Sequence, residues 1–299
     1  MRVVLLGEPG GWHLERLAEA FRSRGHDVAC VRWGQLAAGV GPEGEWFAPE
    51  PIARADAIVV RGMPGVGTGP DRLEEVVFRM DVLARLAARG TTVVNPPRAL
   101  EIAIDKYLTL CVLAAAGLKV PRTRVVQSAD AAERAWIELG GDCVVKPMFG
   151  SRGRGLVRLT TVASARAAAA GGGIAYLQEF LPHEGWDVRV LVAGHRTFAM
   201  RRVAPAGEWR TNLALGGRPE AFTPPADWVE TAVRAAAALG AHLTGIDLVP
   251  TTDREVVVLE ANAVPGWKGL QSVTSSDLTA EVADFVEERA SFGRQARRP

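Results

Sequence analysis

The spacing of apolar segments along the chain is different before and after Pro96-Pro97, and this difference limits the folds that the chain can adopt. Over residues 1–97, short apolar runs typical of buried strands alternate with helical patterns, which predicts a small parallel α/β subdomain. Over residues 123–203, short apolar runs follow one another closely, with one Ala-rich helix at 162–170, which predicts antiparallel sheets with helical cover. We therefore expect an α/β subdomain joined to α+β structure, and two or three subdomains suit a chain of 299 residues.

The charges nearly balance, with 35 basic against 34 acidic side chains. This balance argues against a nucleic-acid or membrane surface as partner. The longest N-terminal apolar run, "VVLL" at 3–6, is too short for a signal peptide, so we expect a cytoplasmic protein. Cys30, Cys111 and Cys143 each lie in an apolar segment and are expected to be buried, reduced thiols.

Two neighbouring strand patterns, "TGIDLVP" at 244–250 and "REVVVLEAN" at 254–262, carry polar residues near their ends. If they pair as a hairpin, Asp247 lies near the end of one strand, and Glu260 and Asn262 share a face near the end of the other. Two carboxylates and an amide oxygen on one point would repel unless a hard cation lay between them, and Mg²⁺ fits this donor set. A solvated strand end with two surface acids is the alternative.

A glycine-rich turn follows a buried strand in "VVKPMFGSRGRG" at 144–155. Its glycines could fold over phosphates and offer backbone N–H groups, while Lys146 supplies a point charge. The segment lacks the Gly-Lys-Ser/Thr of a Walker A loop. A glycine hairpin beside a structural lysine is the alternative.

Two further segments carry polar groups suited to a nucleotide. In "YLQEFLP" at 176–182 a strand becomes a connector whose backbone can pair with the edge of an adenine, and Asp187 would then accept from ribose hydroxyls. In "RRVAPAGEWRTNLALGG" at 201–217, arginines and an asparagine could bind phosphate or carboxylate, and Gly216-Gly217 would let backbone approach a ligand. Surface acids and an Arg-rich solvated hairpin are the alternatives.

Lysine and asparagine are rare in this chain, so each one that occurs is a candidate for a role. The four lysines and three asparagines are Lys106, Lys119, Lys146, Lys268, Asn95, Asn212 and Asn262.

In order and spacing these motifs resemble the ATP-grasp superfamily and, within it, the RimK-like amino-acid ligases, from about Asn95 to Phe285. The resemblance implies the ATP-grasp fold, in which two α+β subdomains clasp ATP behind a Rossmann-like α/β domain. The expected boundaries are 1–97 for the α/β domain, 98–185 and 186–290 for the two ATP-grasp subdomains, and 291–299 for a flexible tail.

The resemblance also implies a role for each motif residue. Phosphate contacts fall to Lys106 and Lys146, under a lid that contains Gly150, Ser151, Gly153 and Gly155. Adenine would face Gln178, Glu179 and Phe180, and ribose would face Asp187. The catalytic side chains near the transferring phosphoryl group would be Arg202, Arg210 and Asn212. Two Mg²⁺ (or Mn²⁺) ions would be held by Asp247, Glu260 and Asn262.

The implied reaction activates a carboxylate with ATP to an acyl phosphate, which an amine then attacks to form an amide. The partners would be an amino acid, glutamate or a similar one, and a carboxylate-bearing acceptor. The spacing over residues 72–110 is similar to coenzyme-directed members such as tetrahydromethanopterin:glutamate ligases. Modification of a protein C-terminus, as by RimK itself, and a non-catalytic ATP-binding regulator are the alternatives. Relatives are often homodimers or homotetramers.

Three expectations follow for this chain. Arg61 and the loop at 7–13 would face the substrate cleft if the first subdomain packs as in the family. Ala214 stands where these sequences often carry His, which affects substrate choice rather than the phosphate or metal ligands. Replacing Asp247 or Glu260 by Ala should stop turnover without unfolding the protein.

Overall fold

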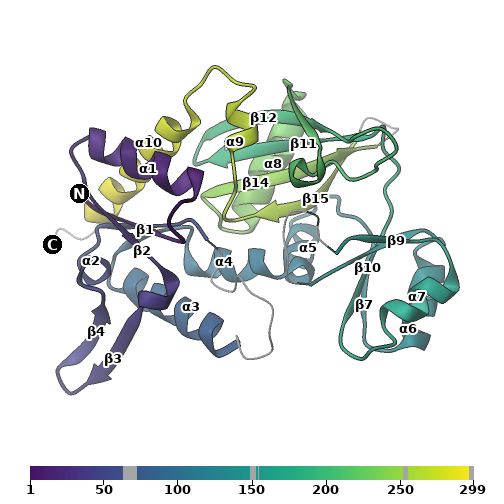
Figure 1. Ribbon diagram of the computed structural model, residues 1–299, viewed down its shortest axis with the longest axis horizontal. Coiled ribbons are helices and arrows are strands. Elements are labelled where there is room, and N and C mark those ends of the chain that lie inside the picture. The colour runs from purple at the N-terminus through teal and green to yellow at the C-terminus, as the bar shows by residue number, and fades with distance from the viewer. Residues whose placement is uncertain (63–72, 149–152, 154, 252–254, 296–299) are drawn as a thin grey trace.

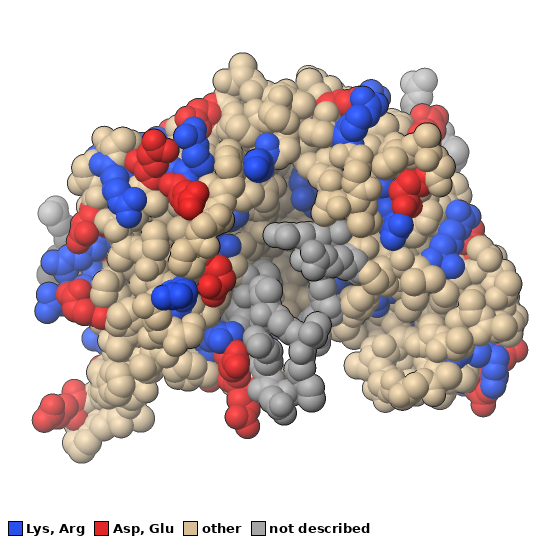
Figure 2. All heavy atoms as spheres, in the orientation of Figure 1, with Lys and Arg blue, Asp and Glu red and all other residues tan. Residues whose placement is uncertain are grey.

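The computed structural model describes residues 1–62, 73–148, 153, 155–251 and 255–295. Within these residues the chain forms three sheets and a separate two-stranded hairpin (Figure 1). Figure 2 shows basic and acidic side chains interspersed over one face, which is hollowed between the lobe of the first sheet and that of the second.

The first sheet is parallel throughout, in the order β2-β1-β5-β6, which confirms the expected α/β subdomain. Its strands are β1 (Arg2–Leu6), β2 (Asp27–Val31), β5 (Ala57–Val60) and β6 (Thr92–Val94). Helices α1 (Trp12–Ser23) and α10 (Leu278–Gln295) cover one face, and α2 (Glu50–Ala53) and α3 (Leu73–Ala88) the other. Burial on both faces explains why β1 and β5 are continuous apolar runs.

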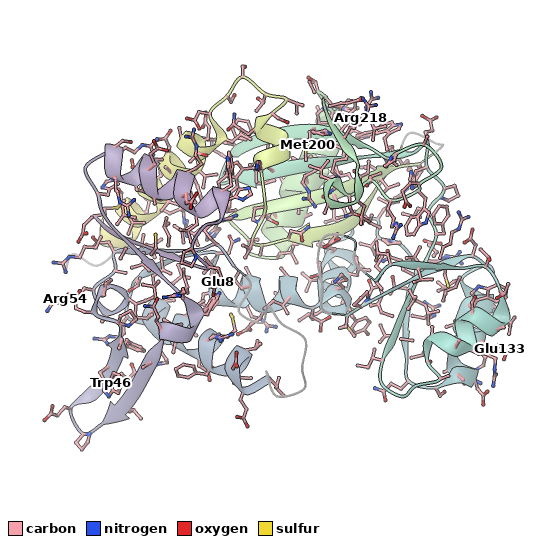
Figure 3. All side chains as sticks on the ribbon, in the orientation of Figure 1. Glu8, Trp46, Arg54, Glu133, Met200 and Arg218 are labelled. Atoms are coloured by element: carbon pink, nitrogen blue, oxygen red, sulfur yellow. The ribbon has the colours of Figure 1, made fainter. Side chains whose placement is uncertain are left out.

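A hairpin that the sequence did not predict projects from this lobe, formed by β3 (Ala37–Gly41) and β4 (Gly44–Ala48). The indole of Trp46 lies against Gly39, so closely that a Cβ atom there would overlap it (Figure 3). Only Phe47 of the hairpin is buried, so the segment lacks the apolar alternation that marks a strand in a sequence.

The second sheet is antiparallel, in the order β7-β10-β8-β9, as the closely spaced strand patterns predicted. Its strands are β7 (Thr123–Val126), β8 (Cys143–Lys146), β9 (Val157–Leu159) and β10 (Ala175–Glu179). Helices α6 (Ala129–Glu138) and α7 (Val162–Ala168) close a small core of its own over this sheet.

The third sheet is also antiparallel, in the order β13-β12-β11-β14-β15. Its strands are β11 (Trp186–Ala193), β12 (Arg196–Val203), β13 (Arg218–Ala221), β14 (Leu243–Pro250) and β15 (Val256–Asn262). Helices α4 (Pro97–Ile104), α5 (Lys106–Ala115) and α8 (Ala226–Ala238) pack on one face. The other face shares one core with α1, α10 and the first sheet, and α9 (Lys268–Gln271) adds Leu270 to that core.

The packing crosses the expected subdomain boundaries. α4 and α5, assigned from sequence to the second subdomain, pack instead on the third sheet. α10 continues to Gln295, so the segment expected to begin a flexible tail at 291 is helical as far as the structure describes it.

Two of the three cysteine expectations are wrong. Cys143 is buried, but Cys30 and Cys111 are exposed, and all three are free thiols. Among the described helices, none combines the length and the apolar character needed to cross a membrane.

Candidate active site

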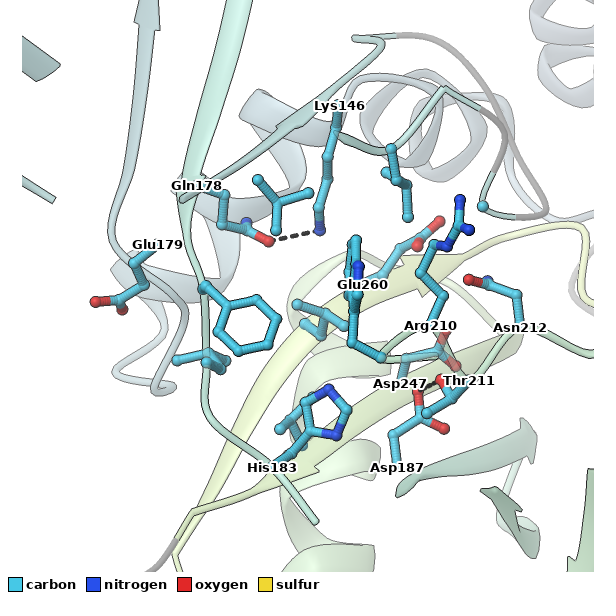
Figure 4. A pocket seen from close by; sticks show the side chains of 18 of the residues that line it. Lys146, Gln178, Glu179, His183, Asp187, Arg210, Thr211, Asn212, Asp247 and Glu260 are labelled. Carbon is cyan, nitrogen blue, oxygen red and sulfur yellow. Dashed lines mark hydrogen bonds between the residues drawn. The ribbon is translucent and has the colours of Figure 1, made fainter. Parts of the chain in front are cut away.

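The structure gathers most of the predicted residues around one cleft between the second and third sheets (Figure 4). The predicted residues that line it are Lys106, Lys146, Gly153, Gln178, Glu179, Phe180, Asp187, Arg202, Arg210, Asn212, Asp247 and Glu260. Asn262 and Gly155 lie outside this lining. Gly150 and Ser151 fall outside the described residues, as do the lid arginines at 152 and 154.

The two strands of the candidate metal site pair as predicted. β14 and β15 form an antiparallel pair in which Asp247 lies opposite Glu260 and Gly245 opposite Asn262. Asp247 lies within its strand rather than at the end, because β14 continues to Pro250. The register shifts directly after Asp247, a bulge of the kind that re-aims a side chain.

Asp247 is buried and already has two cationic partners. Both of its oxygens accept from Arg189, at 2.6 and 2.7 Å, and Arg202 Nη2 lies 3.0 Å from Oδ2. Burial alone would raise the pKa of Asp247, but these guanidinium groups hold it below its usual value. The carboxylate is therefore ionised and acts only as an acceptor.

The oxygen donors at this point fit a Mg²⁺ ion bound together with phosphate. Asp247 and Glu260 supply two carboxylates from paired positions, and Asn262, two residues after Glu260 but outside the cleft lining, offers an amide oxygen; all are hard oxygen ligands. Over all described residues, this site included, no group of three His, Cys, Asp or Glu side chains could hold a metal. The site has too few protein ligands to enclose a cation alone, which is how Mg²⁺ sites that share substrate phosphates are built.

Arg202 joins two acids of the cleft. Its guanidinium contacts Asp187, with Nε 2.7 Å from Oδ1, as well as Asp247. Thr211 Oγ1 donates to Asp187 Oδ2 at 2.7 Å, and both acids and Arg202 are buried. The two carboxylates raise the pKa of Arg202 against the opposing effect of its burial. In the structure Asp187 thus has protein partners where ribose hydroxyls were expected.

Both predicted phosphate-binding lysines are partly desolvated. Lys146 Nζ donates to Gln178 Oε1 at 2.5 Å (Figure 4), and Lys106 Nζ donates to Met148 O at 3.3 Å. Burial lowers the pKa of Lys146 to about 8, although the negative Glu260 partly opposes this. Burial also lowers the pKa of Lys106, again against Glu260. Two desolvated cations that face one carboxylate are suited to an anionic ligand.

The connector expected to face adenine is held by its own neighbours. The backbone N–H groups of Glu179 and Phe180 donate to Arg122 O and Asp142 O, at 3.0 and 3.1 Å. These two N–H groups are therefore not available to the edge of an adenine. The Phe180 ring is stacked by Arg158, whose Cζ lies 3.6 Å from the ring centroid.

The segment at 209–217 contributes its first four residues, 209–212, to the lining of the cleft. Arg210 is paired with Glu208, Nη2 to Oε2 at 2.5 Å, and both side chains are partly exposed. Gly217 packs so tightly on the carbonyl of Thr211 that a Cβ atom would not fit. Gly217 thus allows a close contact within the segment. From the sequence, we had expected its backbone to approach a ligand.

Three polar or aromatic residues of the lining were not assigned a role from sequence: His183, Trp209 and Thr211. Arg189, which contacts Asp247 but lies outside the lining, was not assigned one either. Only Arg189 had a signal, as the last residue of D-x-R in "WDVRV". Burial lowers the pKa of His183. Trp209 and Thr211 lie in the irregular segment before the short 3-10 helix Leu213–Leu215. An irregular segment has no apolar periodicity from which their positions could be predicted.

A family model described as the RimK-like ATP-grasp domain matches residues 103–286, more than half of the chain. The chain belongs to this family. The tetrahydromethanopterin:alpha-L-glutamate ligase of Methanosarcina acetivorans is 35% identical to this RimK-like protein over 251 residues, 73% of this chain and 76% of that protein. A probable alpha-L-glutamate ligase of Teredinibacter turnerae is 30% identical over 300 residues, 97% of this chain and 96% of that one.

Solved structures of ATP-grasp ligases have the same fold. PsnB, complexed with a phosphomimetic variant of a minimal precursor, Mg and ADP, superposes with a TM-score of 0.75 and 26% identity over 97% of this chain and 99% of its own. A RimK domain ATP-grasp protein from Sphaerobacter thermophilus gives 0.73 and 28% over 96% and 99%. The fold and family expected from the motifs are confirmed. The RimK-like chain is an amide-forming ligase that uses ATP and Mg²⁺.

Proposed function

We propose that this RimK-like ligase joins glutamate, or a similar amino acid, to the carboxylate of a coenzyme or another small molecule. The observation that carries the proposal is the convergence of Lys106, Lys146, Asp247 and Glu260 on one cleft. Those residues supply the charges that phosphoryl transfer from ATP to a carboxylate requires. The identity of 35% to a tetrahydromethanopterin:alpha-L-glutamate ligase supports the amino acid and the class of acceptor.

The chain's own residues would act mainly by positioning and by charge. Lys106 and Lys146 would neutralise phosphate oxygens of ATP. This role would explain why two ammonium groups lie in a cleft where burial lowers the pKa of both. Arg210 and Asn212 would lie beside the transferring phosphoryl group once Arg210 leaves Glu208. The acceptor carboxylate attacks the γ-phosphorus, ADP leaves, and the amine of the amino acid then displaces phosphate from the acyl phosphate to form the amide.

Asp247, Glu260 and Asn262 would hold Mg²⁺, or Mn²⁺, and we propose two ions because three oxygen ligands on paired strands can be shared between neighbouring cations. When bound, the ions neutralise phosphate charge. Arg202 would act as a positioning residue. Together with Arg189 it fixes the carboxylate of Asp247, and it also binds the carboxylate of Asp187. A role of Asp187 with ribose remains a prediction, as does a homodimeric or homotetrameric state.

A peptide carboxylate is the second candidate acceptor, and it includes modification of a protein C-terminus. The observation that favours it is the likeness to PsnB complexed with its precursor peptide and AMPPNP, with a TM-score of 0.73 over 97% of this chain. A non-catalytic ATP-binding regulator is the competing function of another class. The two lysines and two acids in the cleft argue for turnover instead.

The test is ADP formation by the purified protein with Mg²⁺ and glutamate across a panel of acceptors: reduced pterin, deazaflavin and furan coenzymes, acidic peptides and small dicarboxylates. We expect ADP release that depends on both acceptor and glutamate, with a product heavier by one glutamyl residue. A product from the peptides alone would favour the second candidate. ATP binding by calorimetry without ADP release from any acceptor would favour the regulator.

A further inference from the structure

A buried cation lies outside the nucleotide cleft, at the side of the first sheet. The guanidinium of Arg61, the residue that follows β5, makes one hydrogen bond, from Nη2 to Pro265 O at 2.8 Å. Its Cζ atom lies 4.6 Å from the ring centroid of Trp267. Nε and Nη1 are buried and have no hydrogen-bond partner among the residues that the structure describes. Burial lowers the pKa of Arg61 to about 10, so the group is charged at neutral pH.

Arg61 occupies the point of the first sheet where α/β proteins bind ligands. In the order β2-β1-β5-β6 the chain passes from β1 to β2 on one side and continues with β5 and β6 on the other. The switch therefore lies between β1 and β5, and ligands of open α/β sheets bind at the carboxyl ends of strands at such a point. Gly7 follows β1 there, and a Cβ atom on it would lie 3.2 Å from the Arg61 carbonyl carbon.

The loop after the paired strands β14 and β15 lies beside Arg61. Pro265, the acceptor for Arg61, follows Asn262 by three residues and packs over Gly245, where a Cβ atom would lie 3.3 Å from it. The position of Trp267 is fixed, because its backbone N–H donates to His13 Nε2 at 2.8 Å. One short loop thus connects Asn262 of the candidate metal site to the residues that contact Arg61.

An unpaired guanidinium in such a place calls for an anion. Burying polar groups without partners costs free energy, and one neutral carbonyl does not neutralise a positive charge. The forked N–H groups of arginine match a carboxylate or a phosphate, and the proposed site for the ATP phosphates is the nucleotide cleft, which Arg61 does not line, so a carboxylate is the better candidate. The partner is not the carboxylate that ATP phosphorylates, because Arg61 does not line the nucleotide cleft.

We propose that Arg61 binds a carboxylate of the amino-acid substrate that takes no part in the reaction, with Trp267 as the apolar wall beside it. The proposal rests on the proposed function and assigns it a donor subsite. An amino acid held there would lie beside the loop at 263–267, which continues from the end of β15 and its candidate metal ligands.

The experiment compares glutamate with its two monoamides, isoglutamine and glutamine, as amine donors for the wild type and for Arg61→Gln. We expect the wild type to discriminate by about 100-fold in kcat/KM against the donor that lacks the bound carboxylate, as for a buried charge pair that loses one partner. Arg61→Gln should lose about as much with glutamate, keep its KM for ATP and no longer discriminate. Arg54→Gln, at an exposed arginine of the same subdomain paired with Glu50, is the matched control and should behave as wild type.

Equal use of glutamate and both amides by the wild type would overturn the proposal without any variant, so misfolding of Arg61→Gln cannot hide a failure. Unchanged discrimination in a folded Arg61→Gln would overturn it as well. If no amino acid supports ADP release, the proposed function fails, and calorimetry of glutamate with both proteins then decides the subsite alone. Binding to the wild type that is lost in Arg61→Gln supports it, whereas equal binding or none overturns it.

Discussion

A Cβ atom on Gly153 would lie 2.5 Å from Oδ1 of Asn212, so the glycine loop of the second sheet touches the segment at 209–217 across the cleft. Gly153 also has φ +71°, a conformation that side chains disfavour. This contact joins the proposed lid to one of the proposed catalytic side chains.

Replacing Gly153 by Ala should reduce kcat/KM by about 100-fold, because the added methyl group displaces Asn212 or holds the loop away from it. Gly172→Ala is the matched control, since Gly172 has φ +75° but nothing within 4 Å of an added Cβ. Both variants carry a similar backbone strain, about 1 kcal/mol. Steady-state kinetics of the two proteins check the prediction, and equal losses would attribute the effect to strain alone.

Glu260→Gln and Asp247→Asn should separate metal binding from stability. We expect Glu260→Gln to lower kcat by at least about 100-fold at any Mg²⁺ concentration while the melting temperature stays unchanged. Asp247→Asn should also cost about 3–5 kcal/mol of unfolding free energy, because Arg189 and Arg202 lose the charge that neutralises them. This corrects the expectation from sequence that removing Asp247 leaves folding intact. Wild-type activity of Glu260→Gln would refute the metal assignment.

Nucleotide binding should weaken as the pH rises through about 8, the pKa of buried Lys146. The phosphates of ADP favour the ammonium form, so binding takes up a proton above this pH and affinity falls by up to about tenfold per pH unit. The unliganded protein should respond oppositely, since the unfolded chain keeps the lysine protonated up to its usual pKa and stability rises with pH. Calorimetry with ADP between pH 7 and 9 checks this. Lys119→Ala, at an exposed lysine, should keep the slope, and Lys146→Gln should lose it.

Asn95 should be among the costliest polar side chains to remove. It is buried, donates to Leu243 O and Ala263 O at 2.5 and 2.6 Å, and accepts from the N–H groups of His242 and Leu243. Asn95→Ala leaves these groups unsatisfied and should cost about 3 kcal/mol or more. Urea denaturation measures the loss, and a value near that of the exposed control Gln127→Ala would contradict this account.

The sequence predicted the sheets well because their cause is local. Apolar runs in β1 and β5, and the glycines that end the helices, are visible in any window of the chain. The attachment of α4 and α5 to the third sheet, and of α10 to the first, depends on contacts between distant residues. The hairpin at 37–48 was not predicted from the sequence, because its strands bury almost no side chain.

The sequence predicted which residues line the candidate site better than it predicted which residues contact one another there. Lys146 and Glu260 lie on the cleft, but the sequence could not show that Gln178 binds Lys146 or that Arg202 spans two acids. Asn95 was singled out by rarity, and its role proves to be architectural. Such pairings are set by packing in three dimensions and have no fixed spacing along the chain.

The four hydrogen bonds of Asn95 fasten the first sheet to both strands that carry Asp247 and Glu260. The second sheet, by contrast, has a core of its own. Arg61 and the metal hairpin, the paired strands β14 and β15, therefore belong to one packed unit that also carries Lys106 on α5, whereas Lys146 lies on a sheet with a separate core. A change in the distance between the second sheet and this unit would alter the contact of Lys146 with the phosphates, but not the spacing between the proposed amino-acid subsite and the metal hairpin.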